Sequence, residues 1–372
     1  MSSPFIRLSR YDARNFFVEE ALVTDSLPHR ATLADVAEAL GVSKATVSKA
    51  LNGRDGISPE TRERVLATVA ALDYRPTTSP SLSASRRAIA AVFDIPGSPY
   101  ILGVLQGALA AATAGHLDLL TRLAPEGSSR RRRAVARNWI ADQRAAGVVG
   151  IVGLTLSEPD GLIAAASEVG MPFVIVDPVD THSRNLVSIG SSNWAGARNA
   201  TEHLLTLGHR RIAWVGGPAA SDAARERLYG YRAALDAAGI PVDPLLTRTG
   251  RFDTTSGSEH ARELLALGQP PTAIMAGDDE IAVGVLATAH AMGIRVPDDL
   301  SVTGFDDTPQ SAWTTPPLTT VHQHLEGMGE VAVQTILAMG DGGRPASRRI
   351  ELATTLTIRS STGPAPTART RA

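Results

Sequence analysis

Short polar and cationic side chains gather in the segment SKATVSKAL near the start of the chain, and their types suit contacts with DNA. Lysine can donate hydrogen bonds to O6 and N7 of guanine, and alanine can contact the methyl group of thymine. Hydroxyl and amide side chains commonly bind phosphate groups. The predicted base-edge contacts are Lys44, Ala45 and Lys49, and the predicted phosphate contacts are Thr46, Ser48 and Asn52.

Two short helices must position these side chains, and the sequence predicts both. The apolar positions at helical spacing are Leu33, Val36, Ala37 and Leu40 in the first helix and Val47, Ala50 and Leu51 in the second. Thr32 and Asp35 form an approximate capping box at the start of the first helix. Gly41 can end that helix in the left-handed conformation, and Ser43 can cap the second. This layout predicts a helix-turn-helix, and it adds Thr32 and Ser43 to the candidate DNA contacts.

A third helix is predicted to complete a small headpiece. Ser58 and Pro59 supply an N-cap and a proline at the first helical position. Val65, Leu66, Val69 and Leu72 then recur at helical spacing before the sequence Tyr74-Arg75-Pro76. An ordinary helical segment is the alternative interpretation, but the glycine turn, the caps and the polar outer helix all agree with a helix-turn-helix.

From Ala88 onward, short apolar runs alternate with helical patterns. AIAAVF, GVVGIVGL and PFVIVD are each followed by a helix-like segment, and the pattern returns at RIAWVGG, TAIMAG and LSVTGF. This is the rhythm of βαβ units, with too many strands for one compact parallel sheet. The sequence therefore predicts an α/β fold with two doubly wound subdomains. Ligands of such sheets bind beyond the carboxyl ends of the strands, here in a cleft between the two.

Polar residues stand just past several of these strands. They are Asp94, Ser98, Asp177, Arg227, Asp278, Asp279, Asp306, Asp307 and Gln323. Carboxylates, an arginine and an amide, with Phe252 as an aromatic face, suit the hydroxyl groups and ring of a sugar. A carbohydrate is therefore the predicted class of ligand.

Composition limits the other possibilities. The chain has 372 residues, a formal net charge of −2 and no cysteine, which excludes disulfides and thiolate chemistry. Neither a signal peptide nor a membrane-spanning apolar run is evident, so a cytoplasmic location is expected. Because the chain is not basic overall, DNA binding needs a local patch. Its candidates are Lys44, Lys49, Arg54, Arg75, Arg86 and Arg87.

No nucleotide-binding, hydrolase or metal-binding motif is present, so no enzyme activity, catalytic residue, cofactor or metal is predicted. Two other classes stay open: a glycosidase that uses a pair of the clustered aspartates, and a sugar-binding protein for transport. His209 is expected to be structural, and the run from Arg130 to Arg133 is expected to be a solvated helix face. Trp194 and Trp313 are expected near the cleft edge or in the core.

The sequence TLADVAEALGVSKATVSKALNG, followed by ISPETRERVLATVAALDYRP, resembles the headpiece of the lactose-repressor (LacI/GalR) family of bacterial transcription regulators. The resemblance continues, in the family's order, through LGHRRIAWVGGP, RERLYGYRAAL, PTAIMAGDDEIAVGVL, RVPDDLSVTGFDDTP and PPLTTVHQ. It covers most of the chain, from about Ala31 to about Thr362. It implies a repressor that binds a palindromic double-stranded operator as a homodimer and responds to a small-molecule effector.

The family's architecture, which resembles periplasmic sugar-binding proteins, implies domain limits and chain crossings near Ser188, Val321 and Ile350. The expected parts are an extension (1–30), the headpiece (31–76), a hinge or linker (77–88), an effector-binding and dimerisation domain (89–363) and a tail (364–372). Within the large domain, the N-subdomain is expected at 89–188 and 322–350 and the C-subdomain at 189–321 and 351–363. No leucine heptads follow Ile350, so a dimer is favoured over a tetramer.

In the family, the linker forms a hinge helix and a leucine wedges open the minor groove. Here Pro80 lies where that helix would run, and the candidate wedge Leu82 comes one residue early. A shortened hinge helix that begins at Pro80 and an unstructured linker both remain open. Lys49 also stands where many relatives have arginine, and it lacks the bidentate guanidinium.

Residue by residue, the resemblance implies a set of effector contacts. They are Arg227, Phe252, Asp278, Asp306 and Gln323, with Asp177 and Ser191 as weaker members. Arg227 could instead pair with Glu226 or a surface acid, Phe252 could fill a local core, and Asp306 and Asp307 could cap backbone groups. Asp278 replaces the family's usual asparagine, and an ionised carboxylate cannot donate a hydrogen bond. Whether the effector releases or tightens DNA binding is left open.

Overall fold

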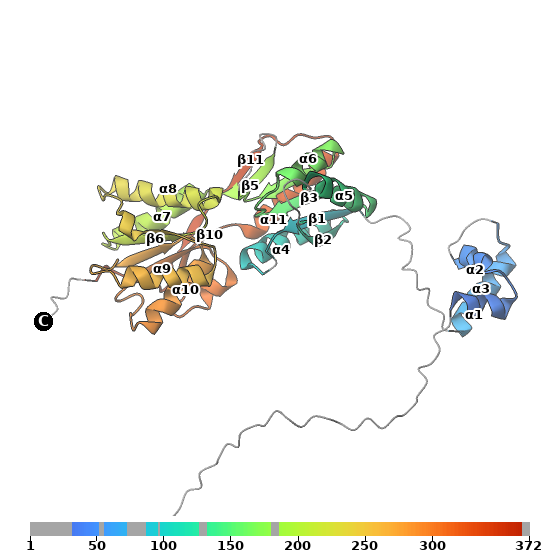
Figure 1. Ribbon diagram of the computed structural model, residues 1–372, viewed down its shortest axis with the longest axis horizontal. Helices are drawn as coiled ribbons and strands as arrows, with labels where there is room; N and C mark the ends of the chain where they lie inside the picture. Colours follow the sequence, from blue (N-terminus) through green and yellow to red (C-terminus); the bar gives the residue numbers. More distant parts are fainter. Residues whose placement is uncertain are drawn as a thin grey trace, which may run out of the picture. The chain divides into compact units, whose positions relative to one another are not determined.

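The computed structural model describes residues 32–51, 56–72, 87–95, 97–125, 132–179 and 186–366 (Figure 1). The chain divides into two units, Met1–Ser83 and Ala84–Ala372. The predictions for Asn52, Pro80 and Leu82 concern residues outside the described ranges, as do those for the extension at 1–30 and for most of the linker.

The first unit holds three helices whose ends are fixed by local hydrogen bonds. They are α1 (Leu33–Leu40), α2 (Lys44–Leu51) and α3 (Pro59–Ala71). The Asp35 carboxylate accepts from the Thr32 N–H at 2.6 Å, and Thr32 accepts in return, which completes the capping box. Gly41 follows α1 with φ 65°, where a side chain would be strained. Ser43 Oγ accepts from the Thr46 N–H at 3.1 Å, so the predicted caps of α1 and α2 are confirmed.

The core of this unit is built from small apolar side chains of all three helices. Val36, Ala37, Val47, Ala50 and Val65 are buried in it. Two residues of the predicted apolar face of α3 are not buried: Leu66 and Leu72 are 51% and 38% exposed. Successive helical residues point about 100° apart, so Val65 and Val69 face the core and Leu66 faces outward.

The second unit contains two six-stranded sheets, each covered by helices on both faces (Figure 1). The N-subdomain sheet consists of β1 (Ala88–Phe93), β2 (Asp118–Leu123), β3 (Val148–Leu154), β4 (Phe173–Val176), β5 (Val187–Ser191) and β11 (Arg349–Leu352). Its order is β11-β5-β4-β3-β1-β2, and all its pairs are parallel. One face packs on α4 (Pro99–Ala114) and α11 (Leu325–Gly340), and the other on α5 (Arg132–Ala145) and α6 (Asp160–Glu168).

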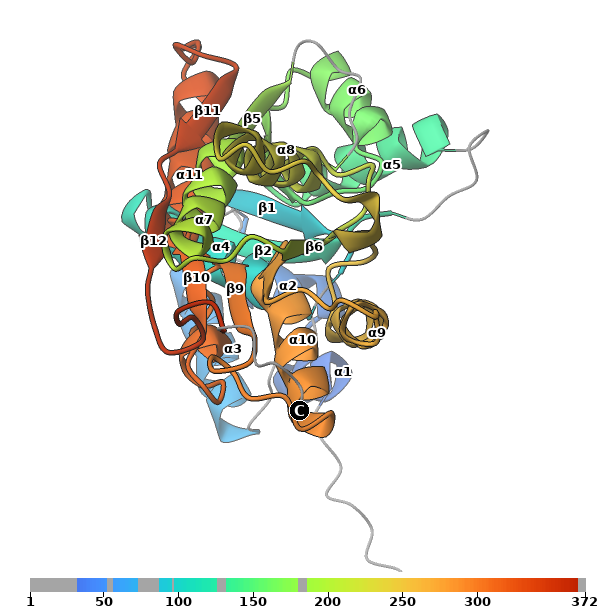
Figure 2. The ribbon, with the colours of Figure 1, turned by 90° about the vertical axis from the view of Figure 1, so that its left-hand side faces the viewer.

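The C-subdomain repeats this arrangement. Its sheet consists of β6 (Ile212–Gly216), β7 (Thr247–Thr249), β8 (Ala273–Ala276), β9 (Ser301–Asp306), β10 (Thr319–His322) and β12 (Thr355–Thr357), in the order β12-β10-β9-β8-β6-β7. Only β12 is antiparallel to its neighbour. Helices α7 (Asn193–Thr206) and α8 (Asp222–Ala237) cover one face. Helices α9 (Thr254–Leu265) and α10 (Asp279–Ala291) pack side by side on the other, with α9 seen end-on in Figure 2.

The chain passes between the two sheets after β5, after β10 and after β11. The positions expected for these crossings, Ser188, Val321 and Ile350, lie inside those strands. The passages begin just after these positions, at the ends of the paired strands, close to where they are expected. The two doubly wound subdomains predicted from the sequence are confirmed, and the carboxyl ends of their central strands carry the polar residues described next.

Candidate DNA-binding helix and effector site

Helix α2 presents a cationic surface. Lys44, Ala45 and Lys49 are exposed, Thr46 and Ser48 are partly exposed, and the helix contains no acidic residue. Thr32 and Ser43, also predicted as DNA contacts, use their side-chain oxygens as helix caps. Their contact with DNA stays a prediction, as do the contacts of the five residues on α2.

Arg227 lies at the centre of the polar residues of the second unit. It projects from α8 with 3% of its surface exposed. Its Nε donates to Asn193 Oδ1 at 2.8 Å, and Nη1 donates to the Gly277 carbonyl at 2.7 Å. The guanidinium also lies 3.8 Å from the centroid of the buried Phe305 ring. The alternative pairing with Glu226 does not occur, because Glu226 binds Arg349.

Asp306 and Gln323 form the next part of the site. Asp306 ends β9 in a left-handed conformation with φ 108°, and its Oδ1 lies 3.3 Å from Arg227 Nη1. Gln323 Nε2 donates to the same oxygen at 2.5 Å, whereas the buried Gln323 Oε1 has no hydrogen-bond partner within the described part of the chain. Burial raises the pKa of Asp306 well above its usual value, although Arg227 opposes this shift. An unsatisfied buried acceptor is costly, so Gln323 Oε1 favours a ligand that donates a hydrogen bond.

Asp278 follows β8 and caps α10, where its Oδ1 accepts from the Ile281 N–H at 2.7 Å. Only 4% of the residue is exposed, and this burial raises its pKa to about 8. The sequence-based statement concerned an ionised carboxylate, whereas the raised pKa favours the protonated form. At neutral pH its carboxyl group is largely protonated and can donate as well.

The two neighbouring aspartates have structural roles. Asp279 accepts from the Thr308 N–H and hydroxyl at 2.8 Å each and from the Thr320 hydroxyl at 2.5 Å. Asp307 is held by Arg359 at 2.6 Å and by other donors that include Ser311. Asp306 thus faces Arg227 and Gln323, whereas Asp307 binds the C-terminal part of its own subdomain.

The N-subdomain contributes Asp177, which follows β4 with φ 43°. Its Oδ2 accepts from the Tyr100 hydroxyl at 2.6 Å. Burial raises the pKa of Asp177, and both Tyr100 and Arg227 counteract the shift, so the carboxylate lies within the field of a residue from the other subdomain. Ser191 donates to the sulfur of Met328 at 3.3 Å, which is a packing contact inside the N-subdomain.

Phe252 was expected either to contact the effector or to fill a local core, and its position fits both. Its half-buried ring packs against Gly217 and the apolar core of the C-subdomain. The Arg227 guanidinium also lies 6.0 Å from its centroid, so the ring borders the polar cluster.

Two further residues belong to this site and were not predicted from the sequence: Asn193, which binds Arg227, and Tyr100, which binds Asp177. Asn193 opens α7 directly after β5, a strand too short and mixed to be recognised as an apolar run. Tyr100 lies in the first turn of α4, two residues past the predicted Ser98. Both residues carry a polar side chain at the start of a helix that follows a strand, and this pattern could have identified them.

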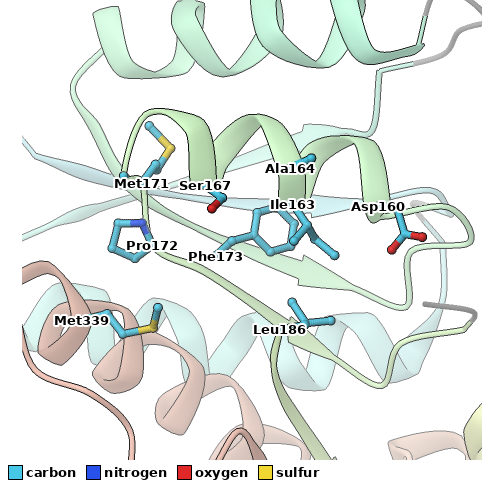
Figure 3. A pocket seen from close by; sticks show the side chains of 10 residues that line it. Asp160, Ile163, Ala164, Ser167, Met171, Pro172, Phe173, Leu186 and Met339 are labelled. Atoms are coloured by element: carbon cyan, nitrogen blue, oxygen red, sulfur yellow. The ribbon is translucent and has the colours of Figure 1, made fainter. Parts of the chain in front are cut away.

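A cleft between the subdomains encloses about 130 Å³. Its lining includes Asp177 and Ser191 from the N-subdomain and Asn193 and Glu226 from the C-subdomain. A larger hollow of about 540 Å³ lies elsewhere, between α6, β4 and the end of α11 (Figure 3). It is lined mainly by apolar side chains such as Phe173 and contains none of the predicted effector contacts.

Other predictions concern residues outside the site. His209 is fully buried and bonds Thr272, Ser301 and the Gly363 carbonyl, which confirms its structural role. Trp194 and Trp313 are 41% and 77% exposed, so neither belongs to the core. Within the described ranges, no helix is long and apolar enough to span a bilayer, and no cluster of histidines and carboxylates could hold a metal ion.

The chain resembles known proteins along most of its length. A family profile described as "Bacterial regulatory proteins, lacI family" matches residues 32–77, and one described as "Periplasmic binding protein-like domain" matches residues 201–362. The chain is 32% identical over 340 residues to the HTH-type transcriptional regulator CelR of Thermobifida fusca, with 89% of this chain and 98% of that protein covered.

Two solved structures show the same similarity. The complex of the transcriptional regulator CelR with cellobiose has a TM-score of 0.66 at 31% identity, covering 89% of this chain and 100% of that one. The lac repressor dimer bound to operator and the anti-inducer ONPF has a TM-score of 0.66 at 28% identity, covering 90% and 99%. The headpiece and the two-subdomain unit thus define a helix-turn-helix transcriptional regulator with a periplasmic-binding-protein-like domain. The chain belongs to the lacI family of bacterial regulatory proteins.

Proposed function

We propose that this chain is a repressor that binds a palindromic operator as a homodimer, and that a carbohydrate effector in the cleft sets its affinity for DNA. The observation that carries the proposal is the buried group of Arg227, Asp306 and Gln323 at strand ends, with Gln323 Oε1 unsatisfied. Convergent polar groups beside a cleft are typical of a ligand site, and Arg227 is linked to the cleft through Asn193, which lines it. The same chain presents the cationic outer face of α2, so ligand binding and DNA binding belong to one molecule.

The relatives support the class of both ligands. CelR has been solved with cellobiose, and the lac repressor has been solved as a dimer on its operator. We propose that Lys44, Ala45 and Lys49 contact base edges, that Thr46 and Ser48 contact phosphates, and that Thr32 and Ser43 orient α2 as caps next to the DNA backbone. Two such helices would enter successive major grooves about one helical turn apart.

The cleft offers a physical route for control. Asp177 and Tyr100 belong to the N-subdomain, whereas Arg227, Asp278, Asp306 and Gln323 belong to the C-subdomain. A ligand that bonds both sets favours one arrangement of the subdomains, and the three crossings are the segments that must absorb the change. The effector acts only through its different affinities for the two arrangements.

Exposed apolar side chains on one edge of the N-subdomain supply a candidate dimer interface. Leu102 and Leu109, seven residues apart on α4, are 58% and 53% exposed. Leu123 on the edge strand β2 is 59% exposed. Such surfaces commonly mark protein contacts, and most homo-oligomers are two-fold dimers. Sedimentation analysis should show a dimer that Leu109→Glu converts to monomer.

We further propose that the protein acts in the cytoplasm and catalyses no reaction. A glycosidase needs two carboxyl groups that flank a substrate bond. Here Asp278 caps α10, and Asp306 is bound to Arg227 and Gln323. These contacts suit binding rather than proton transfer.

The test is selection of bound DNA from a random pool, repeated with a panel of mono- and oligosaccharides. We expect enrichment of a palindrome and a change of at least tenfold in operator affinity with one sugar. The sign of that change identifies the sugar as inducer or corepressor. Failure to enrich any sequence would refute DNA recognition, and a palindrome unaffected by every sugar would refute the carbohydrate effector.

A further inference from the structure

The effector site holds more carboxyl groups than cations. Asp177, Asp278 and Asp306 all feel the charge of one guanidinium, that of Arg227, which lies 3.3 Å from Asp306. In the adjoining cleft, Asp222, Glu226 and Glu351 accompany a single cation, Arg349. Arg349 is bound to both Glu226 and Glu351. The site and the cleft together therefore hold more carboxyl groups than cations, although Asp222 is also paired with Arg225 outside the lining.

The cluster lacks a hydrogen-bond donor for one of its buried acceptors. Gln323 uses its amide N–H on Asp306, so that its buried Oε1 is left as an acceptor without a partner in the described structure. Arg227 already directs Nε to Asn193 and Nη1 to Gly277 and Asp306. A neutral hydroxyl donates once, whereas an ammonium group donates three times, accepts nothing and adds a positive charge.

Buried carboxylates without a counter-charge are unfavourable, and without a ligand the cluster compensates by holding protons. Burial raises the pKa of Asp278 to about 8 and that of Asp306 well above its usual value. A cation placed among these groups would supply the missing charge and satisfy Gln323 Oε1 at once.

We infer that the effector is an amino sugar, whose ammonium group lies among Asp278, Asp306 and Gln323 Oε1 while its hydroxyl groups contact the adjoining cleft, whose lining does not include these three residues. This inference rests on the proposed effector site and narrows its ligand. Asp278 sets the preference for an ammonium group over a neutral group, because its carboxyl group can carry a negative charge. Asparagine at this position has nearly the same shape but no negative charge. Asparagine is also a favoured N-cap, so Asp278→Asn preserves the start of α10.

Isothermal titration of the full-length protein at pH 6.5 tests the inference with three matched pairs: D-glucosamine with D-glucose, D-galactosamine with D-galactose, and D-mannosamine with D-mannose. In at least one pair we expect the amino sugar to bind at least tenfold more tightly than its neutral partner. Asp278→Asn should weaken that amino sugar at least tenfold and change the neutral sugar less than threefold. Asp298→Asn, which removes an exposed carboxylate paired with Arg295, is the control and should change neither.

Three results would overturn the inference: no binding of any amino sugar, neutral sugars that bind as tightly as their amino partners, or an unchanged preference in Asp278→Asn. Operator binding, measured on the same preparation, distinguishes failure of the amino-sugar inference from failure of the proposed function. A neutral sugar that shifts operator affinity leaves the proposed function intact, whereas loss of selective operator binding contradicts the proposed function itself.

Discussion

Asp278→Asn should be more stable to unfolding than wild type, and this difference should grow as the pH rises. Burial raises the pKa of this carboxyl group from 3.8 to about 8. The folded protein therefore holds the proton more tightly than the unfolded chain does. The stabilisation that this proton provides is complete below the usual pKa and is lost as the pH rises through about 8.

The magnitude follows from the linkage relation. Between the two pKa values, each pH unit changes the free energy of unfolding by about 1.4 kcal/mol. From pH 5 to pH 7, wild type should lose ~3 kcal/mol relative to Asp278→Asn. Asp279, Asp306 and Asp177 titrate in both proteins, so the difference between the two curves reports mainly Asp278.

Thermal unfolding of both proteins at half-unit steps from pH 4 to pH 8, followed by calorimetry, measures this difference. The melting temperatures should nearly coincide at pH 4 and separate by several degrees at pH 7, with the variant higher. Parallel curves over the whole range would show that Asp278 is ionised in the folded protein, and the account of its donor role would be wrong.

Three further substitutions test the other parts of the account. Arg227→Met removes the guanidinium from Asn193, Gly277 and Asp306 and leaves these buried partners unpaired. The free energy of unfolding, measured by urea titration, should therefore fall by about 3–5 kcal/mol. A loss under about 1 kcal/mol would contradict this. Lys49→Ala should weaken operator binding by about 1–3 kcal/mol through one base pair, measured on a set of operator variants, whereas an equal loss on every sequence would make Lys49 a phosphate contact. Ala37→Leu should unfold the headpiece, because Ala37 is 5% exposed between the helices and overpacking costs about 1–3 kcal/mol; retained operator affinity would show that the helix crossing is placed incorrectly.

The features predicted well from the sequence are those that short-range interactions decide. The Thr32–Asp35 capping box, the left-handed Gly41 and the Ser43 cap each depend on neighbours within four residues. Central strands such as β1, β3 and β8 were predicted because they are continuous apolar runs buried on both faces. The resemblance, rather than periodicity, implied that Arg227, Asp306 and Gln323 share a site.

Features decided by distant contacts were not predictable from the sequence. The strands β5, β11 and β12 are short or partly exposed, so their pairing depends on where the chain crosses between sheets. Asn193 gained its role only because Arg227, far along the chain, reaches it. The protonation of Asp278 likewise depends on complete burial by other segments, which residue spacing does not reveal.

We expect a ligand bound among Asp306, Arg227 and Gln323 to control affinity for the operator. Fluorescence anisotropy with the selected operator, with and without the ligand identified by titration, tests it in wild type and in Asp306→Asn. We expect the ligand to change the wild-type operator Kd at least tenfold, a coupling of about 1.4 kcal/mol. The variant should show no ligand response, and its ligand-free Kd should stay within threefold of wild type. A response of equal size in both proteins would show that the effector acts elsewhere.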